Sequence, residues 1–236
     1  MSEELTKGLV KSRLVEVGYP ANQDEMVNGL IYFKENSYKS GVNADKELAN
    51  AFLNASKKLS GNSGAPDYTA KDKSNDLLIV IECKSDVNKH QTYDNLDDYK
   101  NGIGSSIEIS DYAVNGALHY ASFVNYHYDV VAVAVSGVSK ENYRCTSFYL
   151  PKNKDFSSLY LLEDGTYNDT LMVPANYREM IDELYLPQGY ENFKLTGRWN
   201  VFGPLFSLVN YIAKPEYKDD LIRLLLAETA KIKMTL

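Results

Sequence analysis

The chain has 236 residues, a net charge of −7 and a sequence pI near 5.1, enough length for one well-packed domain with an appended part. Two cysteines and three histidines are too few and too scattered for a zinc module or a disulfide framework. No P-loop or G-x-S-x-G motif is recognisable. No signal peptide or transmembrane run is recognisable either, and the two cysteines show no disulfide pattern, so we expect a cytoplasmic protein with no membrane partner.

Two helices are expected in the first quarter of the chain, near residues 3–17 and 45–59. In the second, "DKELANAFLNASKKL", apolar residues including Leu48 and Phe52 recur at helical spacing. Glu47 stands near its start, where a carboxylate favours the positive end of the helix dipole. Glu47 is therefore either an ordinary first-turn acid or a candidate for a functional role.

A β-hairpin is predicted from Pro66 to Lys84, because the turn-forming run "KDKSND" separates two strand-like segments. The second segment, "LLIVI", is short and rich in β-branched residues, which indicates a strand buried on both faces. A turn centred between residues 74 and 75 places Asp67 opposite Glu82. A turn centred one residue earlier makes them diagonal neighbours, still within reach.

Side-chain alternation along this strand puts Glu82 and Lys84 on one face and Cys83 on the other, where it is most simply a small buried hydrophobe. Buried charges are costly unless they are paired or bind a metal. Asp67, Glu82 and Lys84 therefore converge through local geometry, and two neighbouring carboxylates favour a divalent cation between them. Taken singly, Asp67 fits turn chemistry, and Glu82 with Lys84 fits an ion pair at a strand end.

The polar run 85–110 is too long for an ordinary connector and is expected to be a mobile loop or insertion. A helix should begin at Asp111 behind the N-cap Ser110, with small residues on the side that approaches the sheet. Strands are then expected over 130–135 and in "YRCTSFYLP", and helices over 177–185, 200–213 and 217–232. These predict a domain over 1–150 and a mainly helical extension over 151–236 that packs on the core or links to a further domain.

Asp67, Glu82 and Lys84, with Pro66 and the apolar strand between them, resemble the PD-(D/E)xK nuclease motif. Within that superfamily the text "PD…ECK" is most similar to the N-terminal nuclease domain of type I and type IIG restriction enzymes. "DYAVNGALHYASFVNYHYDVVAVAVSG" resembles the helix and strand that follow the catalytic strand there. The likeness covers about residues 43–137 and implies an α/β fold of the restriction-endonuclease kind, with a mixed central sheet flanked by helices.

The resemblance also implies the roles of the residues. Asp67 and Glu82, helped by the Cys83 carbonyl, would bind Mg²⁺, for which Mn²⁺ can substitute, and Lys84 would orient the attacking water and stabilise charge on the phosphate. An additional metal-binding acid usually comes from the helix before the hairpin, and Glu47 is the best candidate.

The DNA-contacting helix of these nucleases often carries a glutamine and then a tyrosine four residues later. Tyr120 matches the tyrosine, but Gly116 stands in the glutamine's place, which departs from the family's pattern. Asn115 and His119 share one helical face and are alternative contacts to the DNA backbone, although a surface or packed role suits His119 slightly better.

The expected function is that of a metal-dependent DNA endonuclease domain of a restriction-modification enzyme. The alternatives are a nuclease-fold module that positions DNA or a partner protein without cutting, and an RNA or repair nuclease of the same superfamily. The net charge of −7 opposes DNA binding by the chain as a whole. We therefore expect weak, unspecific binding to double-stranded DNA by these residues alone, with specificity supplied by a methyltransferase or a helicase-like motor that the final helical run, uncapped at its end, would join.

Overall fold

The computed structural model describes residues 2–23, 25–58, 60–72, 76–167 and 173–184. The chain divides into two compact units, Met1–Arg178 and Glu179–Leu236, and the first contains the described sheet and the candidate site. The helices expected over 200–213 and 217–232 lie outside the described residues. Within the described part of the chain, no helix has both the length and the apolar character that crossing a membrane requires.

The core of the first unit is a six-stranded mixed sheet in which neighbours in sequence are neighbours in space. Only β3 and β4 run parallel; every other pair is antiparallel. The strands are β1 (Leu30–Lys34), β2 (Tyr68–Asp72), β3 (Leu77–Lys84), β4 (Asp129–Ser136), β5 (Arg144–Leu150) and β6 (Tyr160–Gly165). The predicted α/β architecture with a mixed sheet flanked by helices is thus confirmed.

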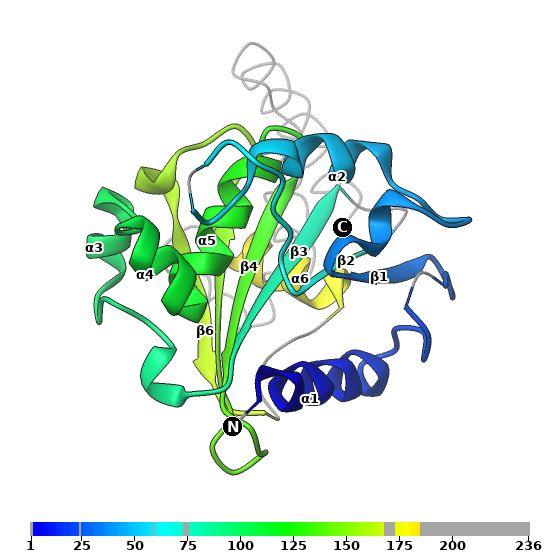
Figure 1. Ribbon diagram of the computed structural model, residues 1–236, viewed down its shortest axis with the longest axis horizontal. Coiled ribbons are helices and arrows are strands. Elements are labelled where there is room, and N and C mark those ends of the chain that lie inside the picture. The colour runs from blue at the N-terminus through cyan, green and yellow to red at the C-terminus, as the bar shows by residue number, and fades with distance from the viewer. Residues whose placement is uncertain (1, 24, 59, 73–75, 168–172, 185–236) are drawn as a thin grey trace, which may run out of the picture. The chain divides into compact units, whose positions relative to one another are not determined.

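Helix α5 (Ala113–Val124) crosses between the parallel strands and packs on β3 and β4, where its small residues allow a close approach. The short helices α3 (Leu96–Asn101) and α4 (Ser106–Asp111) lie beside it, and α2 (Lys46–Ala51) lies near the hairpin (Figure 1). Helix α1 (Glu3–Glu16) lies apart from these, at the bottom of Figure 1. The last described helix is α6 (Pro174–Leu184), close to the predicted 177–185.

Helix α1 is fixed at the C-terminal ends of β3 and β4. The Thr6 hydroxyl lies 2.8 Å from the Gly137 carbonyl oxygen and 3.3 Å from that of Lys84, and it is fully buried. The Tyr68 hydroxyl donates to the Lys7 carbonyl oxygen at 3.0 Å. These contacts bring the N-terminal turns of α1 to the end of the sheet at which β3 finishes.

The predicted helix 45–59 is shorter than expected: α2 ends at Ala51, and a 3₁₀ turn covers Phe52–Asn54. The Phe52 carbonyl oxygen accepts from the amides of Ala55 and Gly64, so it is not available to continue the α-helix. A Cβ on Gly64 would lie 2.1 Å from the Ala55 oxygen, and only glycine permits this approach. The chain that returns toward the hairpin therefore terminates the helix.

The segment 85–110, expected to be a mobile loop or an insertion, contains regular structure: a 3₁₀ turn (Val87–Lys89), α3 and the first residues of α4. Ser105 and Glu108 form a reciprocal capping box, so Ser105 caps α4 and the predicted cap Ser110 lies inside that helix. Strands β1 and β6 were not predicted. Because β6 pairs with β5, the sheet continues past residue 150, the expected end of the core.

Candidate active site at the end of the β2–β3 hairpin

The hairpin pairs Tyr68 with Ile81, so continuing the register by one residue sets Asp67 opposite Glu82. This is the first of the two registers that the sequence allowed, with the turn centred between residues 74 and 75. The Cys83 amide donates to Asp67 Oδ2 at 2.7 Å, which fixes the Asp67 carboxylate against the end of β3. The Cys83 side chain is fully buried, as expected for a small hydrophobe.

Glu82 and Lys84 lie on the same face of β3, as strand alternation predicts, with Lys84 Nζ 3.2 Å from Glu82 Oε1. Glu82 is only 1% exposed, and a second ammonium, from Lys57, also contacts its Oε1. Glu82 Oε2 is buried and has no hydrogen-bond partner within the described structure. One carboxylate oxygen is thus neutralised twice, while the other remains free to accept a ligand.

Lys7 of α1 is the main site residue that sequence reasoning missed. Its side chain is 9% exposed, and its ammonium lies 2.7 Å from Asp67 Oδ1 and 3.0 Å from Glu35 Oε1. Glu3 and Glu4, at 3.5 and 3.7 Å, complete a ring of four carboxylates around it. The contact with Asp67 spans 60 positions of sequence, so no local pattern reveals it.

The charges in the site are strongly coupled. Burial and the neighbouring Glu82 charge raise the pKa of Asp67 to about 6, against the opposing effects of Lys7 and the Cys83 amide. Burial alone would lower the pKa of Lys7 and of Lys84, but the surrounding carboxylates outweigh it and raise both. Both lysines are therefore firmly cationic near neutral pH, whereas Asp67 takes up a proton in mildly acidic solution.

Gly116 of α5 covers the site directly. A Cβ at this position would lie 2.9 Å from Glu82 Cγ and 3.1 Å from the Ile109 carbonyl oxygen. The glycine at this position therefore has a steric cause: α5 lies too close to Glu82 to allow a side chain. Gly116 is thus part of the packing around the carboxylates.

The three predicted DNA-contacting residues of α5 are buried and have partners within the protein. The Asn115 amide nitrogen donates to the Ile103 carbonyl oxygen at 2.8 Å. His119 Nε2 lies 3.1 Å from the Ala55 carbonyl oxygen, and burial lowers the pKa of this imidazole. The Tyr120 ring packs edge-on against Phe52. These three side chains therefore pack within the protein, and the contacts with DNA expected of them stay predictions.

Glu47, the predicted additional metal ligand, is not brought to Asp67 and Glu82. Its carboxylate accepts from the Tyr128 hydroxyl at 2.5 Å and lies 3.1 Å from His127 Nδ1, with half of the side chain exposed. It lies in the first turn of α2, so the dipole role considered from sequence remains available to it.

The donor set suits a hard divalent cation. Two carboxylates and a backbone carbonyl are oxygen ligands of the kind that Mg²⁺ prefers, and the cation keeps several of its waters. The buried oxygen Glu82 Oε2 has no hydrogen-bond partner within the described structure, so it is available to bind a cation. Across the described residues, no group of three or more acidic, histidine or cysteine side chains is arranged as a complete metal cage, so water and substrate oxygens would have to complete the shell.

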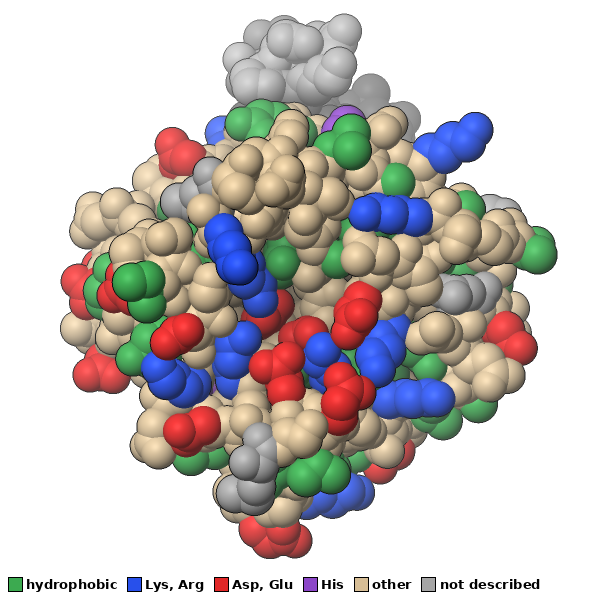
Figure 2. Space-filling model, viewed as in Figure 1, with side chains coloured by type: hydrophobic (Ala, Val, Ile, Leu, Met, Phe, Trp, Pro, Cys, Tyr) green, Lys and Arg blue, Asp and Glu red, His purple; other side chains and the backbone are tan. Residues whose placement is uncertain are grey.

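Figure 2 shows acidic and basic side chains crowded together on the face above the start of α1, rather than separated into patches of one sign. This mixture agrees with the ion pairs of Lys7, Lys34 and Lys84 with the glutamates of α1. No protein-family model, curated protein or solved structure matches the chain, so the geometry of the site carries the functional conclusion.

Proposed function

We propose that this chain is a metal-dependent endonuclease domain with a core of the restriction-endonuclease kind, which hydrolyses phosphodiester bonds in double-stranded DNA. The observation that carries the proposal is the meeting of Asp67 and Glu82 across the β2–β3 ladder with Lys84 on the same face of β3. That arrangement is the one that the PD-(D/E)xK motif requires of its residues.

The carboxylates of Asp67 and Glu82 and the Cys83 carbonyl would hold Mg²⁺ or Mn²⁺. When bound, the cation supplies a more acidic water and neutralises charge on the phosphate. Lys84 remains protonated, because neighbouring carboxylates, led by Glu82, raise its pKa against the effect of burial. It therefore acts as a fixed positive charge, orienting water and stabilising phosphoryl oxygens, and not as a proton acceptor.

The test is cleavage of supercoiled plasmid DNA with Mg²⁺ or Mn²⁺, compared with EDTA, by the wild-type chain, Lys84→Ala and the exposed-lysine control Lys152→Ala. We expect Lys84→Ala to lose a factor of about 100 or more in the single-turnover rate with nearly unchanged thermal unfolding. Normal cleavage by Lys84→Ala would remove the lysine from the mechanism. Absence of metal-dependent cleavage by the wild-type chain would reject the nuclease proposal.

One observation favours the second candidate, a nuclease-fold module that positions DNA or a partner protein without cutting. Lys7 already neutralises Asp67, and Lys57 with Lys84 neutralises Glu82, so the carboxylates are compensated in the absence of a cation. Isothermal calorimetry of Mg²⁺ binding separates the two functions. The nuclease requires a Mg²⁺ site that Asp67→Ala or Glu82→Ala abolishes, whereas the silent module does not require a Mg²⁺ site.

The proposal extends to the setting in which the enzyme acts. We infer a restriction-modification enzyme in which a methyltransferase or a helicase-like motor, on further domains or subunits, supplies sequence specificity. The supporting feature is the resemblance of the hairpin and of α5–β4 to the N-terminal nuclease of such enzymes. Sequence-specific binding of duplex DNA by this chain alone would contradict that division of labour.

A further inference from the structure

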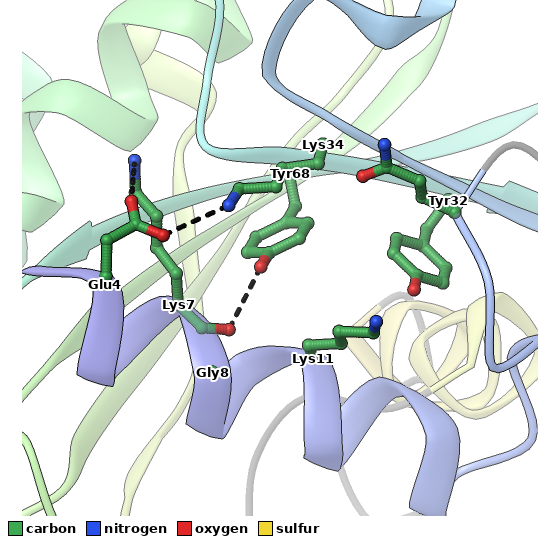
Figure 3. Close-up of a pocket in the computed structure, with 8 residues that line it drawn as sticks. Glu4, Lys7, Gly8, Lys11, Tyr32, Lys34 and Tyr68 are labelled. Carbon is green, nitrogen blue, oxygen red and sulfur yellow. Dashed lines mark hydrogen bonds and ion pairs between the residues drawn. The ribbon is translucent and has the colours of Figure 1, made fainter.

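A pocket of about 430 Å³ lies between α1 and the strands β1 and β2 (Figure 3). Its α1 side is formed by residues 4, 7, 8 and 11, which follow one face of the helix. Its sheet side includes Tyr32, Lys34 and Tyr68, and Gln23 also lines it. We call this the α1 pocket.

The α1 pocket adjoins the carboxylate pair through Lys7. The ammonium of Lys7 contacts Asp67 at 2.7 Å, while its backbone carbonyl accepts from the Tyr68 hydroxyl inside the pocket. Lys11 lies four residues further along α1, about 6 Å in axial rise. A polymer bound at Asp67 and Glu82 and running along α1 would therefore reach the pocket next.

The chemistry of the lining favours an anion. Three lysines face one glutamate, and Glu4 is shared between Lys7 and Lys34. Lys7 is held by Asp67 and Glu35, so the available positive charge belongs to Lys11 and Lys34. Within the described residues Lys11 forms no ion pair, and the Lys34–Glu4 pair is solvent-exposed and easily exchanged.

Gly8 gives a second, independent indication. It lies inside α1, where glycine lowers helix stability relative to alanine. A Cβ at Gly8 would meet no heavy atom within 4 Å, so no packing contact in the protein requires the glycine. Because Gly8 lines the pocket, the glycine leaves open space for a ligand to approach the helix backbone.

We propose that the α1 pocket binds a phosphate group of the DNA strand, next to the phosphate that the carboxylate pair would address. Lys11 and Lys34 provide the charge, and the Gln23 amide adds a hydrogen-bond donor. This inference rests on the proposed function for the identity of the polymer. It also gives an acidic chain a local cationic contact for a polyanion, independent of the net charge of −7.

The test is a fluorescence-anisotropy titration of a duplex oligonucleotide with the full chain in EDTA, at several salt concentrations, so that binding is measured without metal or cleavage. We expect Lys11→Ala to weaken binding several-fold and to reduce the salt slope by about 0.9, the value of one phosphate contact on duplex DNA. Gly8→Glu, which adds bulk and negative charge to open space, should weaken binding further. Gly8→Ala, which fills part of that open space, should weaken binding less than Gly8→Glu does, and the distant Lys152→Ala should bind like the wild type.

Unchanged affinity and salt slope in Lys11→Ala and Gly8→Glu, or no binding by the wild type at low salt, would overturn the proposal. A parallel NMR titration follows the amide resonance of Gly8 with inorganic phosphate and with duplex DNA. If phosphate shifts this resonance and duplex DNA does not, the pocket binds free phosphate and the assignment to a phosphate of the DNA strand fails. Binding through the pocket without Mg²⁺-dependent cleavage would reject the nuclease and retain the pocket. Mg²⁺-dependent cleavage by Gly8→Glu with an unchanged KM would reject the pocket and retain the nuclease.

Discussion

Replacing Lys7 by methionine should produce a loss of stability that depends on pH. The substitution keeps the length of a side chain that is 9% exposed and removes the charge facing Asp67, which is itself 8% exposed. Asp67 would then share the end of the hairpin with Glu82 and have no ammonium of its own. Removing one partner of a buried ion pair typically costs about 3–5 kcal/mol, because the other charge is left uncompensated.

The sign of the pH dependence follows from the pKa of Asp67, which is about 6 in the folded protein against an ordinary value of 3.8. Its raised pKa means that the stability it contributes is complete below about pH 4 and is lost as pH rises through 6. The loss amounts to about 3 kcal/mol. Without Lys7 the pKa of Asp67 rises further, so the loss continues to higher pH. The two proteins should therefore differ little at pH 5 and by up to about 3 kcal/mol at pH 8, since the pKa of Asp67 in the wild type is about 6.

Urea unfolding followed by circular dichroism between pH 4.5 and 8.5 measures this difference. Lys11→Met is a matched control on the same helix, because Lys11 is exposed, and it should change stability by no more than about 0.5 kcal/mol at any pH. In a double-mutant cycle, adding Asp67→Asn to Lys7→Met should recover most of the loss at pH 8. A loss of equal size at pH 5 and pH 8, or a cycle without coupling, would refute this account of the site.

Three further predictions concern the surroundings of the carboxylates. Gly116→Ala should destabilise the protein by about 1–3 kcal/mol despite its gain in helix propensity, because the new methyl group collides with Glu82; thermal unfolding measures it. Burial and then Arg144 lower the pKa of His90 to about 3, so stability should fall as pH drops from 6.5 toward 3, by up to about 4 kcal/mol, and His90→Gln should abolish that fall in acid urea titrations. Lys57→Met should tighten Mg²⁺ binding in calorimetry, since it removes a competing ammonium from Glu82, and unchanged affinity would show that Lys57 does not compete.

The hairpin and its two acidic residues could be predicted because they depend on short-range rules. Counting residues from the turn places Asp67 opposite Glu82, and alternation places Lys84 beside Glu82. The buried strands β3 and β4 could be recognised by their β-branched residues. Strand β3 continues three residues past the apolar run 77–81, and β4 exceeds the expected 130–135 by one residue at each end. Where strand geometry alone fixes the neighbours, the sequence is sufficient.

The rest of the site depends on contacts between segments distant in sequence. Lys7 reaches Asp67 from α1, and Lys57 reaches Glu82 from the loop after α2; neither lysine stands in a recognisable motif. Glu47 satisfied the sequence criterion for a further ligand, yet α2 ends early and its acid pairs with Tyr128. Asn115 and His119 share a helical face as predicted, but that face is covered by the loops that carry Ala55 and Ile103. Tertiary packing decides in each case which polar residues meet.

The charged cluster is difficult to explain as a device for stability. Replacing a buried ion cluster by apolar side chains of similar volume is often neutral or stabilising, so folding alone does not favour its retention. Here folding also raises the pKa of Asp67 to about 6, which costs free energy at neutral pH, and it leaves Glu82 Oε2 buried without a partner in the described structure. Strained electrostatics of this kind concentrate at functional sites, where a ligand supplies the missing interaction. A cation between the two carboxylates would relieve the repulsion, satisfy the free oxygen and replace the ammonium of Lys57, so the same features that weaken the fold favour the proposed ligand.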